Sequence, residues 1–368
     1  MNKNEQIKGI SGLKGIAACI IAFVWHYQHF AGPEVAPFKS ILPILYSYGY
    51  LMVELFFILS GFGIMSGYSE RIMNHEISFP VFISRRIKKI YPLFFATTII
   101  VVILEALYYI KMGSTFVYPN YDIFHLILNL LFIQDGLVGT EWSLNSPSWC
   151  ISICVVCYSL VYALIYHSKN KHEMIYKFII SACLGVALIA SKENYPILNS
   201  LMGRGIANFF IGALIYELYT HKSKFQYKRV GYLCVFFLVM AFIIIRFMSM
   251  EFVGNVQLAF TLGLGPMLLM SVLFLPVINK VFGCKLFVFL GEISLGIYLF
   301  HFPVQCIIRV ADIYFDIGIN YASDFFWIGY AASVIAVSAL YRFFVQNKYE
   351  NSFLKFFSVR NAVKNGSH

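Results

Sequence analysis

Long apolar segments recur along the whole chain, separated by short stretches that hold most of its charged residues. Most segments run to roughly 17–23 residues, which is enough for a helix to cross a bilayer whose core is about 30 Å thick. This pattern predicts an all-α polytopic membrane protein, a bundle of about ten transmembrane helices. The expected spans are 10–30, 44–66, 90–110, 148–167, 177–191, 203–219, 230–249, 256–277, 287–308 and 324–346.

Two segments need separate interpretation. Ile123–Ile133 is apolar but too short to cross, so we expect it to re-enter the bilayer or to lie on its surface. The first segment has no small-residue cleavage site and many spans follow it, so we interpret it as a retained helix. The expected organisation is one transmembrane domain over 1–350 and a cytoplasmic tail over 351–368.

The distribution of basic residues indicates the orientation. With ten spans both termini lie on one side, and the loops on that side hold most of the 28 lysines and arginines. The positive-inside rule then makes both ends cytoplasmic, in a multi-pass protein of the cytoplasmic (plasma) membrane. This bias and the anionic lipid headgroups account for the net charge of +10, so no nucleic acid partner is needed.

Composition excludes a soluble protein. Of the 368 residues 60% are hydrophobic and 12% charged, and the mean hydropathy is +0.73. Among the cysteines, Cys150, Cys154 and Cys157 share a helical face. A soft-metal site there is an alternative to packing as small apolar residues, and we favour packing, with no metal. No extramembrane piece can form a catalytic domain, so we expect any chemistry within the membrane part.

Ionisable side chains stand inside three of the apolar segments. His26 lies in the first, Glu54 in the second and His301 in the ninth, where Tyr298 is three residues away and shares its helical face. Such groups are costly in hydrocarbon and mark a pathway or a chemical site by default. A single buried histidine is more often structural, but several titratable groups together favour a site. His29, one turn after His26, stays unassigned.

A basic cluster precedes the third segment, and Pro92 follows it closely; the cluster consists of Arg85, Arg86, Lys88 and Lys89. It can be a positive-inside anchor. If Pro92 lies in the first turn of a helix, the helix N-terminus adds attraction for phosphate, which arginine binds with two hydrogen bonds. The cluster then becomes the docking site of a nucleotide-bearing donor.

Three further residues are candidates for substrate contact. Ser60 with Gly61 suits close helix packing, Trp149 suits the aromatic belt at the membrane boundary, and Arg204 can extend its side chain to water. Ser146 is a plausible N-cap for the fourth span. Each has this structural explanation beside the functional one.

At these residues the chain resembles the membrane-bound acyltransferase 3 family, which O-acylates carbohydrates at the cell surface. The matches follow one order along most of the chain, and that order is more specific than any single motif. They are Gly12 to Ala17 leading to His26, Leu55 to Phe62, Ser84 to Arg86 with Ile90 to Pro92, Ser148-Trp149 leading to Tyr158, Arg204 leading to Gly212, and Gly291 to Pro303.

The chain also departs from the family pattern. Ser11 stands where an acid often does, Lys14 and Lys89 replace arginines, Cys154 replaces a frequent glutamate, and Gln346 replaces a late acid. These departures indicate a divergent branch and weaken the transfer of any one member's substrate.

The resemblance implies that His26 is catalytic and that Arg85 and Arg86 hold an acyl-coenzyme A. It implies acetyl-CoA as co-substrate, no bound cofactor, and a carbohydrate acceptor, either a surface polysaccharide or a lipid-linked sugar. We expect His26 to remove the proton of a sugar hydroxyl that attacks the thioester, with an acyl-histidine intermediate as a covalent variant. Glu54, Tyr298 and His301 are candidates for orienting His26 or the acceptor.

Other functions stay open at this point. A transporter of a glycan or a small acid would also place histidine, glutamate and arginine in the membrane, but the chain has no internal repeat. A membrane assembly or sensor protein with structural histidines is a third interpretation. Homo-oligomerisation is not decided by the sequence.

Overall fold

The computed structural model describes residues 3–32, 34–134, 137–138, 142–191, 195–221, 227–247 and 255–346. The expected tail at 351–368 lies outside the described residues. Within the described ranges the regular structure is helical, with no β-strand and one isolated bridge between Asn120 and Ser143.

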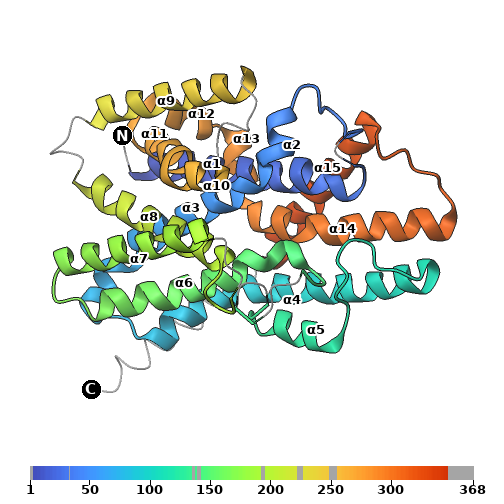
Figure 1. Cartoon of the computed structure of the whole chain (residues 1–368), viewed down its shortest axis with the longest axis horizontal. Coiled ribbons are helices and arrows are strands. Elements are labelled where there is room, and N and C mark those ends of the chain that lie inside the picture. The colour runs from blue at the N-terminus through green and yellow to red at the C-terminus, as the bar shows by residue number, and fades with distance from the viewer. Residues whose placement is uncertain are drawn as a thin grey trace.

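The helices follow one another with short connections (Figure 1). They are α1 Lys3–Cys19, α2 Pro43–Tyr48, α3 Met52–Met73, α4 Phe79–Met112, α5 Ile123–Leu130, α6 Trp149–Tyr166, α7 Lys171–Ser191, α8 Ser200–Thr220, α9 Tyr227–Phe247, α10 Val256–Ala259, α11 Gly265–Phe274, α12 Pro276–Phe282, α13 Lys285–Glu292, α14 Ser294–Phe315 and α15 Asp324–Leu340. The segments Ile20–Trp25, Phe260–Leu264 and Tyr341–Gln346 are π-helical.

Ten helical segments of the described chain are long and apolar enough to cross a membrane, which confirms the predicted fold class and number of spans. The orientation of the termini stays a prediction. The segments are Lys8–His29, Pro43–Met73, Phe79–Met112, Ser146–Tyr166, Lys171–Ser191, Ser200–Thr220, Tyr227–Ile245, Val256–Phe274, Ser294–Phe315 and Asp324–Gln346.

Close helix packing places the polar residues of the second and sixth spans opposite one another. A Cβ atom at Gly61 of α3 would overlap the carbonyl of Phe209, and one at Gly212 of α8 would overlap the carbonyl of Ile58. Small residues thus bring the two backbones together, which confirms the packing explanation for Gly61. Elsewhere α7 packs on α8, and α4 lies beside α14 (Figure 1).

Three expected helix boundaries are wrong. Pro92 lies in the interior of α4, which begins at Phe79 with Pro80 in its first turn, so the basic cluster lies within a helix rather than before one. A membrane helix tolerates an internal proline because neighbouring groups satisfy the freed carbonyl. Ser146 begins a 3₁₀ turn, and α6 starts after Ser148.

The third error concerns the ninth span, expected as one helix over 287–308. The chain instead breaks at Ile293 between α13 and α14. The short apolar segment is helix α5, whose N-cap Asp122 accepts a hydrogen bond from the backbone N–H of His125. It is confirmed as too short to cross.

Candidate active site

The end of the first span is wound to present two histidines on one side. After α1 the helix widens to the π form over Ile20–Trp25 and then tightens to the 3₁₀ form over His26–His29. Residues three apart eclipse one another in a 3₁₀ helix, so the rings of His26 and His29 stack with centroids 5.1 Å apart.

Helix α15 holds the π-helical segment in place. A wider helix leaves carbonyls without their usual partners, and two of them accept side-chain donors here. The indole Nε1 of Trp327 donates to the carbonyl of Phe23 at 2.6 Å, and the Tyr330 hydroxyl donates to that of Ala22 at 3.3 Å. The winding before His26 therefore has specific support from a distant part of the chain.

His301 of α14 meets His26 edge to edge. Their ring centroids lie 4.8 Å apart with an interplanar angle of 8°, and Nδ1 of His26 lies 2.7 Å from Nε2 of His301. Nδ1 of His301 in turn lies 2.7 Å from the backbone carbonyl of Tyr298. The imidazoles of His29, His26 and His301 thus form one contiguous group in which His26 contacts the other two.

The carbonyl determines the tautomers of this chain. Because a carbonyl oxygen only accepts, Nδ1 of His301 carries the proton, and in a neutral ring its Nε2 is then an acceptor. Nδ1 of His26 must donate to it. The second nitrogen of His26, Nε2, is left with its lone pair and has no hydrogen-bond partner among the described residues. The hydrogen bonds thus leave Nε2 of His26 able to accept a proton, and His301 fixes this tautomer.

Gln305 connects the imidazole of His29 to the same hydrogen-bond network. Gln305 donates from Nε2 to the carbonyl of His26 at 2.8 Å and accepts with Oε1 from Nδ1 of His29 at 2.9 Å. The hydroxyl of Tyr118 lies 3.4 Å from the remaining nitrogen of His29. His29 thus has partners on both nitrogens, which distinguishes it from His26.

His26 and His29 line a cavity of about 310 Å³, which we call the outer cavity. Indole rings of three tryptophans form much of its wall, from Trp25, Trp142 and Trp149. Ser146 also lines it, and its buried hydroxyl has no hydrogen-bond partner among the described residues. The outer cavity therefore combines flat apolar surfaces with a few polar groups.

Arg204 enters the outer cavity from α8, and Glu54 of α3 holds it there. Nε of Arg204 lies 2.6 Å from Oε1 of Glu54, which is fully buried, and the guanidinium lies 4.7 Å from the centroid of the Trp149 ring. A buried carboxylate needs a partner of this kind. Glu54 thus contacts the arginine and not the histidines.

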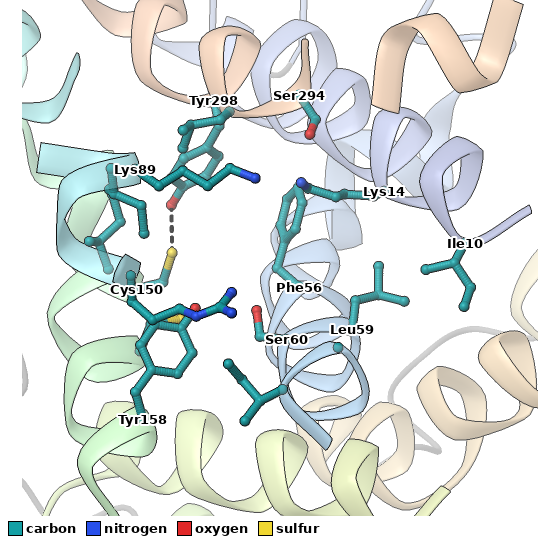
Figure 2. Close-up of a pocket in the computed structure, with 17 residues that line it drawn as sticks. Ile10, Lys14, Phe56, Leu59, Ser60, Lys89, Cys150, Tyr158, Ser294 and Tyr298 are labelled. Atoms are coloured by element: carbon teal, nitrogen blue, oxygen red, sulfur yellow. Dashed lines mark hydrogen bonds between the residues drawn. The ribbon is translucent and has the colours of Figure 1, made fainter. Parts of the chain in front are cut away.

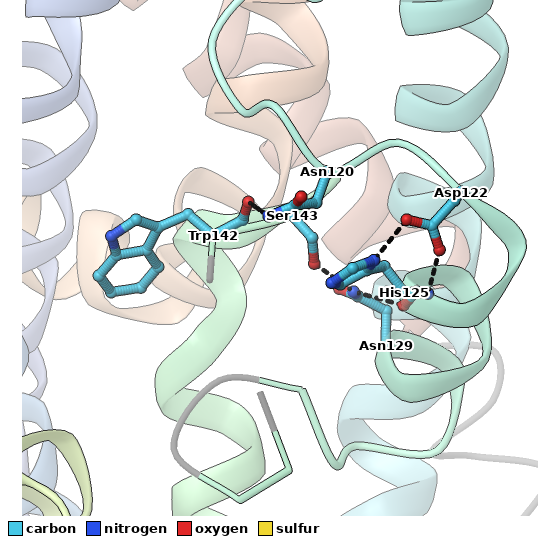
Figure 3. A network of polar contacts seen from close by, with 6 residues as sticks. All are labelled: Asn120, Asp122, His125, Asn129, Trp142 and Ser143. Carbon is cyan, nitrogen blue, oxygen red and sulfur yellow. Dashed lines mark hydrogen bonds and ion pairs between the residues drawn. The ribbon is translucent and has the colours of Figure 1, made fainter. Parts of the chain in front are cut away.

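Described residues of the segment between α4 and α6 line the outer cavity, and hydrogen bonds hold this segment together (Figure 3). Asn120 Nδ2 donates to the carbonyl of Trp142 at 3.2 Å, and Asn129 Nδ2 donates to Ser143 Oγ at 3.1 Å. These bonds join the two ends of the segment, and the ring of Trp142 points away from them. The carboxylate of Asp122 accepts from the backbone and ring of His125, which lowers its pKa below the ordinary 3.8.

A second cavity of about 320 Å³, which we call the inner cavity, is lined by residues of α1 and of the N-terminal half of α4 (Figure 2). Lys14 and Lys89 extend into it from opposite sides, and Arg86 lines it with them. Nε of Arg86 is buried without a hydrogen-bond partner among the described residues. Three cations in a mainly apolar cavity form a site for a polyanion.

Tyr298 lines both cavities. Its hydroxyl donates to the carbonyl of Pro147 and lies 3.1 Å from Sγ of Cys150, which also lines the inner cavity. The side chain is 6% exposed. Tyr298 therefore stands between the two spaces, while its own carbonyl fixes the tautomer of His301.

The structure brings together some of the predicted residues and separates others. His26, Tyr298, Trp149 and Arg204 line the outer cavity, and His301 contacts His26. The inner cavity holds Ser60, Arg86 and Lys89, whereas Arg85 and Lys88 lie on α4 but are not among the residues that line it. Ser60 is thus separate from the other two residues expected to contact substrate.

Sequence reasoning assigned no role to Lys14 or Tyr118, which line these cavities, or to Gln305, which contacts both histidines of the first span. Lys14 is a basic residue inside the first apolar segment, and Gln305 is a polar residue one turn after His301 on the same face. Both were visible as polar positions in apolar surroundings. Tyr118 comes from a connecting segment, and no local pattern indicates its position.

The sequence profile of the acyltransferase domain family matches residues 7–342. A relative from Acidianus two-tailed virus, named "Putative acetyltransferase ORF330", is 25% identical over 335 residues, or 88% of this chain and 91% of the relative. No solved structure matches the chain. The match extends over nearly the whole bundle that carries both cavities, and the chain therefore belongs to the acyltransferase 3 family of membrane proteins and is an acyltransferase.

Proposed function

We propose that the protein transfers an acyl group, with acetyl as the default, from cytosolic acyl-CoA to a hydroxyl of a cell-surface or lipid-linked carbohydrate. One observation carries this: a base with a free lone pair and a cation-lined cavity lie on opposite sides of Tyr298. A phosphate-bearing donor and a hydroxyl acceptor would each have a compartment, and the reacting atoms would meet between them.

The inner cavity suits the donor. Lys14, Arg86 and Lys89 carry three positive charges toward one space, and the diphosphate and 3′-phosphate of CoA are the anions they would hold. By the positive-inside rule this cavity opens toward the cytoplasm, where acyl-CoA is made. The pantetheine arm would extend past Phe56 and Ser60 toward Tyr298.

The outer cavity suits a sugar. Tryptophan rings offer flat faces for the C–H side of a sugar ring, while Arg204 and Ser146 offer donors to its hydroxyls. A volume of about 310 Å³ accommodates about one sugar unit, so the rest of a polymer or a lipid carrier would extend outside.

In the reaction, Nε2 of His26 removes the proton of the acceptor hydroxyl as its oxygen attacks the thioester carbonyl. Nδ1 of His26 donates to Nε2 of His301, so the imidazolium that forms is stabilised without rotation of the ring. The tetrahedral intermediate breaks its C–S bond, and His26 returns the proton to the leaving thiolate. The products are an ester and free CoA.

The test uses purified protein in detergent or vesicles with acetyl-CoA labelled in the acetyl group. We expect release of free CoA and label on an added glycan or lipid-linked sugar. Substituting His26→Ala should lower the rate by about 10²–10⁴-fold while donor binding persists. His172→Ala, on the exposed face of α7, is the control. A His26→Ala protein of normal activity would contradict the proposal.

A further inference from the structure

A third cavity, of about 520 Å³, lies where α3 turns into α4 and α6 ends; we call it the aromatic cavity. Its walls include His75 and Phe79 from the turn and the first residue of α4, and Tyr162, Tyr166 and His167 from the last part of α6. None of the residues that line it is acidic. It belongs to neither compartment described above.

Ring contacts hold this wall together. Tyr162 and Tyr166 stack with centroids 5.6 Å apart, Phe79 packs on Tyr162 at 5.2 Å, and His75 packs on Tyr166 at 4.4 Å. The Tyr162 hydroxyl donates to the carbonyl of Ile77 at 2.9 Å and fixes the turn to α6. Phe79 and Tyr166 stay 38% and 40% exposed, so ring surface is available.

The aromatic cavity lies in line with the inner cavity along two helices. On α4, Phe79 and Arg86 are seven residues apart and share a face, about 10 Å along the axis. On α6, Tyr166 and Tyr158 are eight residues apart, about 12 Å, and Tyr158 lines the inner cavity. The two cavities are thus successive positions along α4 and α6.

A layer of packed aromatic side chains lies between the two cavities. Phe82 is fully buried and packs on Tyr162 and Tyr68, with ring centroids 5.4 Å and 5.2 Å apart. The guanidinium of Arg86 lies over the same Tyr68 ring at 4.3 Å. Arg86 of the inner cavity is therefore fixed to the same packed layer.

We propose that the aromatic cavity binds a purine base, namely the adenine of the acyl-CoA donor. This rests on the proposed function, because the inner cations would hold the phosphates and adenosine follows the phosphates directly in CoA. A neutral base can stack on tyrosine, phenylalanine and histidine rings without a charged partner. The two histidines can form hydrogen bonds with the edge of the base. The donor would then extend along α4 and α6 past this layer, with its base in the aromatic cavity and its thioester at Tyr298.

Truncated donors test the site. Acetyl-pantetheine has the thioester arm but no nucleotide. We expect Tyr166→Ala to raise KM for acetyl-CoA about tenfold with little change in kcat, and to leave both constants for acetyl-pantetheine unchanged. Tyr166→Phe should restore the normal KM for acetyl-CoA, since the ring and not the hydroxyl stacks. Tyr176→Ala, an exposed tyrosine of α7, is the matched control.

Binding of adenosine 3′,5′-bisphosphate, measured by calorimetry on the purified protein, gives a readout independent of turnover. We expect about tenfold weaker binding to Tyr166→Ala than to the unaltered protein. Equal loss with both donors, or unchanged affinity for the bisphosphate, would overturn the base site and leave an ordinary aromatic belt. If the unaltered protein transfers nothing from acetyl-CoA, the proposed function fails, and the bisphosphate measurement still decides the site.

Discussion

The backbone carbonyl of Tyr298 determines which nitrogen of His26 is available as a base. It accepts from Nδ1 of His301, and the remaining donors and acceptors follow in order to the lone pair on Nε2 of His26. In this chain His301 occupies the place that a carboxylate holds in a serine-type triad. A neutral orienting group suits a site inside a membrane, because it adds no buried charge.

Substituting His301→Phe removes the acceptor for Nδ1 of His26. We expect kcat to fall at least about 100-fold with KM for acetyl-CoA little changed, because the ring that takes the proton is no longer oriented. His301→Gln should recover a measurable part of the rate, since its amide oxygen can accept the same hydrogen bond. Steady-state kinetics of both variants check this, and equal rates in the two would contradict an orienting role.

Tyr298 separates the two cavities by side-chain contacts that can be removed. Tyr298→Phe loses the hydrogen bonds to Pro147 and Cys150, worth about 1–2 kcal/mol together. The fraction of molecules in which this side chain has moved aside and the two cavities are connected should rise by about 5- to 30-fold. Without an acceptor, we expect faster hydrolysis of acetyl-CoA because water reaches the thioester. Release of free thiol measures it; an unchanged rate would show that the tyrosine is not the barrier.

At this scale the sequence predicts which residues are unusual and not which residues they contact. The cost of polar groups in hydrocarbon identified His26, Glu54 and His301. That Glu54 pairs with Arg204 and not with a histidine depends on how closely α3 and α8 approach, and Gly61 and Gly212 determine that approach. Such pairing is a property of packed helices and is absent from any one segment.

Among the elements, the π-helical turn before His26 depends on α15. Trp327→Phe leaves the carbonyl of Phe23 without its indole donor, which we expect to cost about 1–3 kcal/mol and to favour an ordinary α-helical winding. His26 would then rotate away from His301, and kcat should fall with protein still folded. Thermal unfolding and kinetics check this against Phe325→Leu, which alters a highly exposed position of α15.

The N-cap of α5 gives a prediction with a pH dependence. Asp122→Ala should lower the stability of helix α5 by about 1 kcal/mol at neutral pH. The pKa of Asp122 is lower in the folded protein than its ordinary 3.8, because the backbone and then the ring of His125 donate to it. Its contribution is therefore full above about pH 4 and is lost as the pH falls through the lowered pKa.

Amide-exchange protection of residues 123–130, corrected for the intrinsic rate, measures this. At pH 7 the Asp122→Ala protein should exchange faster than the unaltered one, and at pH 2–3 the difference should shrink. Asp122→Asn keeps a capping oxygen and is the control. A difference that grows on acidification would contradict the role of the ionised carboxylate.

Helix number could be predicted from the sequence, whereas helix boundaries could not. The length of apolar runs fixes the count because each run must cross the same bilayer. Pro92 suggested a helix start, yet α4 continues through it, and Ile293 interrupts a run that reads as one helix. Both outcomes depend on which neighbours satisfy the backbone, and that requires the assembled bundle.

For the whole molecule, two cavities that share Tyr298 would let an acceptor at one face react with a donor from the other. The inner cavity contains three cations. The outer cavity contains His26, aromatic rings and Arg204, and Tyr298 lines both cavities. Neither cavity is formed by one element: α3, α6 and α14 contribute to both, and the first span contributes Lys14 to the inner cavity and His26 to the outer one. The chain therefore needs most of its length to form the site, in agreement with a family match over residues 7–342.

Two adjacent arginines on α4, Arg85 and Arg86, provide a test of whether the inner cavity binds the donor. Arg86 lines it with a buried Nε, whereas Arg85 does not line it. Arg86→Met should raise KM for acetyl-CoA about 10- to 100-fold, from the loss of a charge-assisted phosphate contact of about 1.5–3 kcal/mol, and should weaken the dependence of KM on salt. Arg85→Met should change KM by less than about threefold, because Arg85 does not line the inner cavity and salt screens a cation outside it at physiological ionic strength. Titrations at low and high salt separate the two variants, and equal shifts would mean that the phosphates bind along the outside of α4 and not in the inner cavity.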